Sequence, residues 1–310
     1  MPVILYVLLS LVLMILFSGV YTFVVACVRG REPDWLNEEE LSKTTFGKYY
    51  ENICIGNNFM VEHNAVDVYT NSFDGLKLHA VWVPAENPRG TILFAHGYRS
   101  CKFVDFSLAF EMYHELGMNI LAVDQRSHGK SEGKIITFGV KENRDMQSWI
   151  AFHNQTFGEY NIILSGLSMG ASTMLYLADK DLPENVRGII ADCGFTSPRD
   201  ILARVFRSVT HLPAGPTLFV VELLARIFGG FGLTQEDTRR SLKNSKIPVF
   251  MVHGAADDFV PCEMTKAGYD ACTGSKELLL VDGAGHGTSF LVEKEKYVNA
   301  VKAFLDKYLD

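Results

Sequence analysis

The pattern of apolar and polar residues divides the chain into an uncharged N-terminal stretch and a longer region of alternating strand and helix patterns. From Val3 to Val28 no charged residue occurs. A helix of this length would reach roughly 35 to 40 Å, enough to cross a hydrocarbon core of about 30 Å. Beyond residue 64, short apolar runs that fit strands alternate with longer segments that fit helices. The pattern predicts one transmembrane helix followed by an α/β domain.

The α/β region is expected to begin with an antiparallel hairpin. Val66–Thr70 and Leu76–Val83 alternate apolar and polar residues around a turn over residues 71–75. Further strands are predicted by apolar runs of the kind that parallel sheets bury, over Thr91–Ala95, Asn119–Val123, Ile162–Leu164, Gly188–Ala191, Val249–Val252 and Glu277–Val281. Helices are predicted over Val104–Leu116, Val140–Phe157, Ala171–Ala178 and Glu263–Ala271, and from Ser289 to the C-terminus. This alternation is typical of a mostly parallel, doubly wound sheet.

One segment interrupts the alternation. Thr196 to Ser245 contains no clear strand and is far longer than a connection requires, and insertions of this size are usually functional. Within it, Leu218–Leu233 is apolar and helix-like, with Glu222 and Arg226 on one face at spacing i,i+4. We interpret residues 196–245 as a helical lid over a substrate pocket. The alternative is that its apolar face only packs on the domain.

The chain is therefore expected to comprise an anchor (1–30), a polar juxtamembrane linker with a short helix (31–64) and the α/β domain (65–310). Arg29 and Arg31 follow the apolar stretch, whereas a cleaved secretory signal would carry its positive charge before it. This favours a retained, single-pass helix over cleavage, although Val24–Cys27 also fits a lipoprotein cleavage site in form. The two arginines predict that the domain faces the cytoplasm.

Composition narrows the class of protein further. With 48% hydrophobic residues, 21% charged residues and a formal charge of -7, the chain of 310 residues is globular and has no basic surface for nucleic acid. Its six cysteines form no C-x-x-C pair, and no histidine pair has the spacing of a zinc helix, so we expect no metal and no other cofactor. The thiols are interpreted as free and buried, with disulfides left open for an exported domain.

The first chemical motif is the turn Gly166-Leu-Ser-Met-Gly170, between an apolar strand and a helix rich in small residues. A nucleophile between two glycines can be held in a strained strand-to-helix turn, where larger neighbours would clash. Ser168 would stand there clear of the sheet, beside the first amides of the following helix. The pattern indicates a nucleophile for acyl transfer.

Such a serine needs a histidine base and a carboxylate that orients the histidine. The strand ending at residue 252 leads into a loop with Asp257 and Asp258, and the strand ending at residue 281 leads to His286 between two glycines. Because the carboxyl ends of parallel strands share one edge, these loops can converge on Ser168. The chain order Ser, Asp, His fits this arrangement, with either aspartate as the acid. Asp282 is ranked lower because it is too close in sequence to the histidine.

From His96 to the C-terminus the chain resembles the α/β-hydrolase superfamily, in its esterase, lipase and serine-aminopeptidase-like branch, some members of which carry an N-terminal anchor. The resemblance rests on the His96-Gly-Tyr oxyanion loop, the Gly-x-Ser-x-Gly elbow, an acid loop of the form HGxxDxxVP and the Gly-His-Gly loop. It implies that Asp257 is the acid and that the backbone amides of Tyr98 and Met169 form the oxyanion hole. Some relatives place the acid at the position of Asp192.

The segment Asp124–Gly133 resembles the D-x-R-G-x-G-x-S loop of the same superfamily, with Ser127 where glycine is usual. We interpret this loop as structural, and we expect Asp124 and Arg126 to pair with each other and fix the turn.

These features together predict a membrane-anchored serine hydrolase that cleaves a carboxylic ester or a related acyl bond through an acyl-enzyme intermediate. The apolar lid and the anchor suggest a small-molecule acyl substrate that is lipid-like. A serine aminopeptidase, amidase or acyltransferase on the same fold is the alternative, and a non-catalytic membrane-tethered binding module is the alternative from another class. Dehalogenases and epoxide hydrolases of this fold are disfavoured because they need an acidic nucleophile at position 168.

Overall fold

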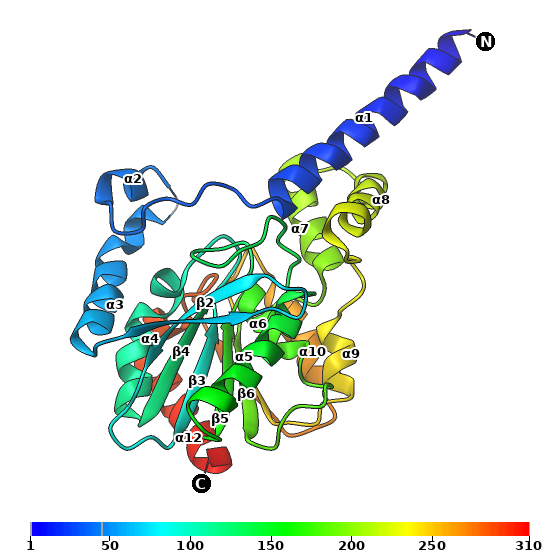
Figure 1. The fold of residues 1–310 in the computed structure, drawn as a ribbon. Coiled ribbons are helices and arrows are strands. Elements are labelled where there is room, and N and C mark those ends of the chain that lie inside the picture. The colour runs from blue at the N-terminus through cyan, green and yellow to red at the C-terminus, as the bar shows by residue number, and fades with distance from the viewer. Residues whose placement is uncertain (1, 45, 310) are drawn as a thin grey trace.

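The computed structural model describes residues 2–44 and 46–309. Its body is an eight-stranded sheet with helices on both faces, and a long N-terminal helix, α1 (Pro2–Cys27), projects away from this body (Figure 1). The strands lie in the order β1-β2-β4-β3-β5-β6-β7-β8. The expected doubly wound, mostly parallel architecture is confirmed, because only β1 and β2 run antiparallel to their neighbours.

The strands follow the predicted apolar runs closely. Their bounds are β1 Val66–Asn71, β2 Lys77–Val83, β3 Gly90–Ala95, β4 Met118–Asp124, β5 Ile162–Leu167, β6 Val186–Asp192, β7 Val249–Gly254 and β8 Lys276–Val281. Strands β3 and β4 are buried along their whole length, as expected for strands covered on both faces. The predicted hairpin is β1 and β2, with Val66 opposite Trp82 in the register.

Successive side chains along each strand point to opposite faces, so the sheet has two apolar layers. Ile92 and Phe94 of β3 pack toward α3 (Tyr50–Glu62), α4 (Lys102–Glu115) and α12 (Lys294–Leu309). Leu93 and Ala95 pack toward the opposite layer. The helices of that layer are α5 (Glu142–Thr156), α6 (Met169–Leu175), α9 (Thr238–Lys243) and α10 (Cys262–Ala271).

The segment between β6 and β7 is helical, as its lack of strand patterns predicted. It contains α7 (Pro198–Thr210), α8 (Gly215–Leu224) and a π-helical turn, η2 (Ala225–Gly229), followed by α9. The predicted i,i+4 pair is present, since Arg226 Nε donates to Glu222 Oε1 at 2.6 Å. In Figure 1, α7 and α8 lie beside the base of α1.

The residues between α1 and β1 are more regular than a linker with one short helix. They form α2 (Glu38–Ser42), a single 3-10 turn, η1 (Gly47–Tyr49), and the full-length helix α3. Helix α3 packs on α4 through Phe59 and Met60, and Gly56 allows a close approach to Ser107. Residues 50–62 are therefore part of one sheet-covering layer.

The parallel strands all run toward one edge of the sheet, the edge nearest α1 in Figure 1. The loops after β3, β5, β7 and β8 leave the sheet at this edge, and the short helix α11 (Ser289–Val292) follows the last of them. The predicted site residues are carried by these loops.

Candidate active site

The turn after β5 has the strained geometry that its sequence predicted. Ser168 has φ 56° and ψ -112°, a conformation that non-glycine residues rarely adopt. A Cβ at Gly170 would lie 1.8 Å from the carbonyl oxygen of Ala95, and one at Gly166 would lie 2.3 Å from Gly170. The two glycines are thus required by space, and they let the strand turn sharply into α6.

The structure brings the three predicted side chains into one hydrogen-bonded chain. Ser168 Oγ lies 2.9 Å from His286 Nε2, and His286 Nδ1 lies 2.7 Å from Asp257 Oδ2. Because Asp257 can only accept, Nδ1 carries the proton of a neutral imidazole and Nε2 is free to accept from the serine. The order and spacing of these contacts match those of the relay that activates a serine hydroxyl in acyl transfer.

Asp257 is held by more donors than the sequence indicated. Its Oδ1 accepts from the amides of Phe259 and Val260 at 3.0 and 2.9 Å, and its Oδ2 also accepts from His253 Nε2 at 3.2 Å. Burial opposes ionisation, but the hydrogen bonds from His253 and His286 outweigh it and hold the pKa of Asp257 well below its usual range. The acid is therefore ionised and fixed in orientation.

The contribution of His253 was missed, although the residue opens the acid-loop motif. Its Nδ1 lies 2.7 Å from the hydroxyl of Thr265, and its Nε2 also donates to the carbonyl of Val260 at 2.8 Å. The fully buried ring thus holds the same carboxylate oxygen of Asp257 that His286 contacts. The spacing of His253 and Asp257 in the acid-loop motif could have indicated this contact, but only the fold shows which of their atoms form the hydrogen bond.

The predicted oxyanion amides flank the serine. Gly97 lies next to the nucleophile, since a Cβ on it would be 3.5 Å from Ser168 Cβ, and Tyr98 follows. Met169 opens α6, so its amide has no partner within that helix. Among the hydrogen bonds of residues 2–44 and 46–309, neither the Tyr98 nor the Met169 amide is a donor. Both N–H groups are available for a ligand oxygen.

The loop that carries Tyr98 is fixed by a carboxylate that sequence reasoning passed over. Asp105, on the first turn of α4, accepts from the Gly97 amide at 2.6 Å and from the Ser100 hydroxyl at 2.7 Å. Burial raises the pKa of Asp105 to about 6. The contact uses the Gly97 amide and leaves the next one, on Tyr98, free.

Two buried histidines support the same loop. His96 accepts from the Gln125 amide, and His128 accepts from the Arg99 amide, each through Nε2 at 3.1 Å. Burial lowers the pKa of His96 to about 4 and that of His128 to about 3, so both rings are neutral acceptors. Their role is to hold the loop against the segment after β4.

The other candidate acids lie elsewhere. Asp258 is exposed, and its backbone carbonyl accepts from Arg204 at 2.8 Å. Asp282 is exposed on the turn after β8. Asp192 is buried, and its carboxylate accepts a long hydrogen bond of 3.4 Å from Ser289, while burial raises its pKa to about 6. Of the aspartates considered, Asp257 is the one in hydrogen-bond contact with His286.

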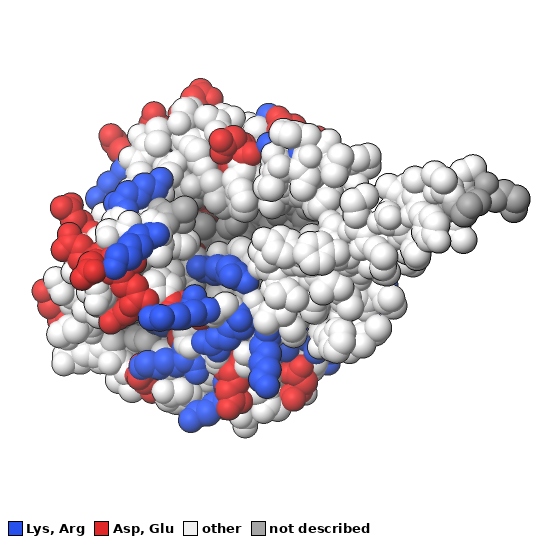
Figure 2. Space-filling model, turned by 90° about the horizontal axis from the view of Figure 1, so that it is seen from above, with Lys and Arg blue, Asp and Glu red and all other residues white. Residues whose placement is uncertain are grey.

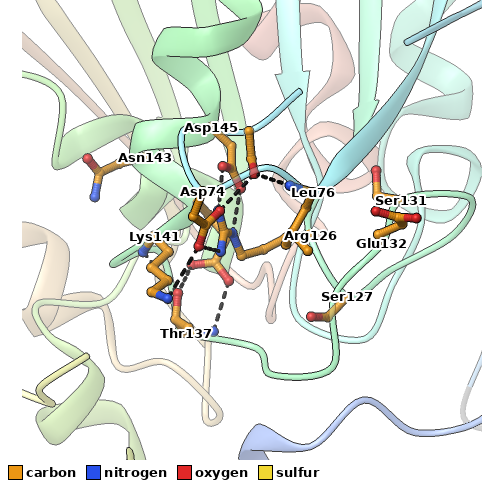
Figure 3. A network of polar contacts seen from close by, with 12 residues as sticks. Asp74, Leu76, Arg126, Ser127, Ser131, Glu132, Thr137, Lys141, Asn143 and Asp145 are labelled. Atoms are coloured by element: carbon orange, nitrogen blue, oxygen red, sulfur yellow. Dashed lines mark hydrogen bonds and ion pairs between the residues drawn. The ribbon is translucent and has the colours of Figure 1, made fainter. Parts of the chain in front are cut away.

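The expected pairing within the loop after β4 is wrong. Arg126 forms two hydrogen bonds of 2.6 Å with Asp145 on α5, through Nε and Nη2, and its Nη1 and Nη2 also donate to Asp74 in the β1–β2 turn (Figure 3). Asp124 instead pairs with the buried Lys102 and with His79 Nδ1. The two residues point to different layers, so each ties the loop to a separate element. The structural role is retained, but the partners come from distant segments.

A cavity of about 170 Å³ opens beside His286, on the face of the sheet covered by α4. Leu167, which precedes the nucleophile, lies on its wall, and the polar groups of Asp105, Asp192 and Ser165 also face it. Its outer wall includes Phe46 and Tyr49, from the segment to which the sequence assigned no chemistry. The segment between α1 and β1 thus borders the candidate active site.

The helical insertion borders the opposite side of the nucleophile. Ile201 and Leu202 of α7 and Leu218 of α8 belong to the same buried apolar cluster as Met169, with Tyr98 packed against it. The insertion therefore lies over the oxyanion side of the site.

In the described part of the chain, one group of metal-ligating side chains comes together, and it is Cys193 with Asp257 and His286. Asp257 and His286 already form a hydrogen bond with each other, and burial raises the pKa of the Cys193 thiol well above its ordinary value. A protonated thiol is a poor metal ligand, so the group fits a hydrogen-bonded site better than a metal site.

Comparison with known proteins gives matches along most of the chain after residue 85. Residues 86–215 match the family described as serine aminopeptidase, S33, and residues 232–309 match the family described as TAP-like protein. The Bacillus subtilis protein YqkD is 28% identical over 228 residues, which cover 73% of this chain and 74% of the relative. A Saccharomyces cerevisiae membrane protein, YNL320W, is 25% identical over 246 residues, covering 75% of this chain and 76% of the relative.

Solved structures with the same fold include two hydrolases. The Pyrococcus furiosus esterase Pf2001 superposes with a TM-score of 0.66 at 24% identity, covering 81% of this chain and 93% of the esterase. The α/β hydrolase GrgF from Penicillium superposes with a TM-score of 0.63 at 19% identity, covering 79% and 99%. At this level of identity the superpositions establish the fold.

Proposed function

Because this chain belongs to the α/β-hydrolase superfamily, we propose that it is a membrane-anchored serine hydrolase that cleaves a carboxylic ester or a related acyl bond. The observation that carries the proposal is the chain of contacts from Ser168 through His286 to Asp257, at 2.9 and 2.7 Å, on a strained turn. A domain that only bound a ligand would have no use for this geometry.

The proposed reaction follows from the positions of these groups. Ser168 Oγ attacks the acyl carbonyl while His286 Nε2 takes its proton, and the free amides of Tyr98 and Met169 stabilise the oxyanion. His286 then protonates the leaving oxygen, and an acyl-enzyme forms. Water, deprotonated by the same histidine, releases the acyl group and restores the serine. Asp257 stays ionised and stabilises the imidazolium in both steps.

The substrate class is proposed to be a small acyl compound, lipid-like in character. The cavity beside His286 and Leu167 has a predominantly apolar wall, which suits an acyl or alcohol group of limited size. The apolar insertion over the oxyanion side and the apolar helix α1 support a substrate that partitions into membranes. No cofactor takes part in the proposed reaction.

Covalent labelling tests the proposal directly. A fluorophosphonate probe phosphonylates an activated serine, so the full-length wild-type protein should be labelled and Ser168→Ala should not be. Ser172→Ala, which removes a second buried serine one helical turn beyond Ser168, is the matched control and should retain the label. An unlabelled wild type, or equal labelling of Ser168→Ala, refutes the enzyme and favours the binding-module alternative.

The choice of acid has its own test. Asp257→Asn should lower the turnover of an acyl ester by roughly 10⁴-fold, because an amide cannot hold the imidazole in the reactive tautomer. Asp258→Asn, at the neighbouring exposed position, should leave turnover within about twofold, as is usual for a surface substitution away from the site. Full activity of Asp257→Asn would rule out the proposed assignment.

The match to a serine aminopeptidase family favours an amidase as the second candidate. The same serine and histidine can cleave an amide, so the two activities differ in the leaving group, which is an alcohol for an esterase and an amine for an amidase. Turnover of p-nitrophenyl esters of graded chain length should exceed turnover of aminoacyl p-nitroanilides. A preference for the anilides would replace the esterase proposal, and product transfer to added alcohols would indicate an acyltransferase.

We further propose that α1 crosses the membrane once and that the domain faces the cytoplasm. Residues Val3–Cys27 form one apolar helix of sufficient length, and Arg29 and Arg31 follow it. Protease added to sealed cells should leave the domain intact and should digest it after the membrane is opened. Digestion in intact cells would reverse the proposed orientation.

A further inference from the structure

Helix α1 is fixed to the domain at its C-terminal end. The chain just after it pairs with residues 134–136, through Ile136 N to Cys27 O at 2.7 Å and Arg29 N to Lys134 O at 2.8 Å. The Tyr98 hydroxyl donates to Ala26 O at 2.9 Å. These contacts hold the helix in a defined direction relative to the domain, in contrast to a flexible tether.

The same helix packs along α8 of the insertion. Ser18 Oγ lies 3.1 Å from Thr217 Oγ1, and the ring of Phe23 lies 6.2 Å from that of Phe228. Gly19 is in the closest approach, because a Cβ there would lie 2.3 Å from Val220 Cβ.

These pairs also give the direction of α8. Thr217, near its N-terminus, meets the position on α1 farther from the domain, and Phe228 meets the nearer one. The two helices therefore run side by side, and the N-terminal end of α8 is its outermost part. The connection from α7 to α8, over residues 211–214, lies at this outer tip.

The length of α1 places this tip relative to a bilayer. The part of the helix ahead of the contact with α8, residues 2–17, is about 24 Å long at 1.5 Å per residue. A hydrocarbon core is about 30 Å thick. About four more residues, from Ser18 onward, must lie in the core, and they carry the first turn of α8 with them.

The surface of the insertion fits that location. On α8, Phe219 is 71% exposed and Leu223 is also exposed, and Ile227 and Phe228 are exposed on η2. Val209 and Leu212 are exposed at the tip. Figure 2 shows α1 and the surface beside it nearly without charge, while charged side chains gather on the half of this face away from α1. An apolar surface of this kind is unusual where it faces water.

We propose that the tip of the α7–α8 hairpin, defined as residues 209–223, is embedded in the acyl-chain region of the leaflet through which α1 leaves the bilayer. The charged residue within this tip is Glu222, which is neutralised by Arg226 and accepts from the Leu233 amide at 2.7 Å. The partner of this surface is thus the lipid bilayer. The inference rests on the proposed membrane crossing by α1.

The position of Arg207 agrees with this depth. It lies on α7 two residues before the tip and is exposed, and no ion pair between described residues includes it. A long basic side chain just below an embedded apolar tip can reach the headgroup phosphates while its aliphatic part stays in the apolar layer.

Tryptophan quenching by lipids brominated on their acyl chains tests the proposal in the full chain, reconstituted in phosphatidylcholine vesicles. Three variants each add one tryptophan: Leu13→Trp in the free part of α1, Phe219→Trp on the hairpin tip and Tyr160→Trp at the amino end of β5, the opposite edge of the sheet. Leu223→Trp is a second tip variant, in case Phe219→Trp fails to fold. For each variant, the quantity measured is its tryptophan emission minus that of the wild type.

The proposal expects brominated lipid to quench most of the emission added at positions 13 and 219 or 223, and to leave that at position 160 unchanged. Quenching at position 13 without quenching at either tip position would overturn the embedding of the hairpin and leave the anchor in place. Absence of quenching at position 13 would overturn both the anchor and the hairpin insertion.

Discussion

Two glycines and one strained serine determine the geometry of the proposed nucleophile. At Ser168 the positive φ aims the side chain out of the sheet, and at Gly170 the backbone approaches Ala95 so closely that no Cβ fits. The strain is stored in the folded state and is balanced by the packing of β5 and α6 on both sides.

Gly170→Ala should therefore lose both stability and reactivity. Relief of a contact of 1.8 Å requires the elbow to move, so the free energy of unfolding should fall by about 3 kcal/mol or more. Urea unfolding and fluorophosphonate labelling measure the two effects. Gly215→Ala, where a Cβ would meet nothing within 4 Å, is the control and should change neither. Wild-type labelling of Gly170→Ala would show that the elbow can relax.

Asp192 provides a pH-dependent test at the same scale. Its pKa in the fold is about 6, above the value of about 3.9 for an unfolded chain, so the folded state prefers the protonated form. The stability that this preference contributes is present below about pH 4 and is lost as the pH rises through about 6. As the pH rises from about 4 to 8, the free energy of unfolding of Asp192→Asn should increase relative to that of the wild type by up to about 3 kcal/mol.

Urea unfolding across this pH range measures that difference. Asp282→Asn, which changes an exposed acid on a surface turn, is the control and should change the free energy of unfolding by less than about 0.5 kcal/mol. A constant difference between Asp192→Asn and the wild type would contradict the raised pKa.

At the residue scale, sequence patterns predicted the groups whose chemistry demands a particular neighbour. A serine between glycines needs a base and an acid, and chain order supplied both. His253 and Asp105 escaped prediction because their roles depend on which buried donors meet which acceptors. The error at Asp124 and Arg126 has the same origin, since residues close in sequence found partners on different layers.

At the scale of elements, the strands and main helices were predictable because long apolar runs bury both faces of a parallel sheet. Helix α3 was less so. Its apolar residues stand among three asparagines and one glycine, and the close approach of Gly56 to Ser107 on α4 adds to the packing of Phe59 and Met60. Through Tyr49 just ahead of it, the same segment reaches the cavity beside His286.

Gly56→Val should separate α3 from α4. A Cβ at this position would lie 2.4 Å from Ser107 Cβ, so the free energy of unfolding should fall by about 1 to 3 kcal/mol. Proteolysis within residues 50–62 should also become faster. Asn58→Val, on the exposed side of the same helix, should change either property much less. Equal effects of the two substitutions would mean that α3 is loosely attached.

At the scale of the whole molecule, the rule that parallel strands share one carboxyl edge was enough to predict that distant loops converge. The attachment of α1 could not be predicted in this way. It depends on a small residue, Gly19, meeting Val220 of another element, and the sequence around it shows only a uniformly apolar stretch.

Thiol reactivity tests the compactness of the whole chain. All six cysteines are free, and five of them are buried, leaving Cys54 as the accessible one. A water-soluble thiol reagent should react quickly with one thiol in the native protein and with six in urea. Dithiothreitol should leave the unfolding midpoint unchanged. Several fast thiols in the native state would contradict the packing, and a shift with dithiothreitol would indicate a disulfide.

The contacts at the end of α1 also determine what a single break in the backbone would do. A protease could nick the chain between Asp34 and Asn37. The contacts that tie α1 to the domain join residues before the cut to residues after it without using the cut segment, so they would survive. Separation would leave the Tyr98 hydroxyl and the Arg99 guanidinium without their carbonyl partners and would expose Phe23 and Cys27 to water. The nicked protein should therefore stay on the membrane as a non-covalent complex, so that shedding would require more than cleavage.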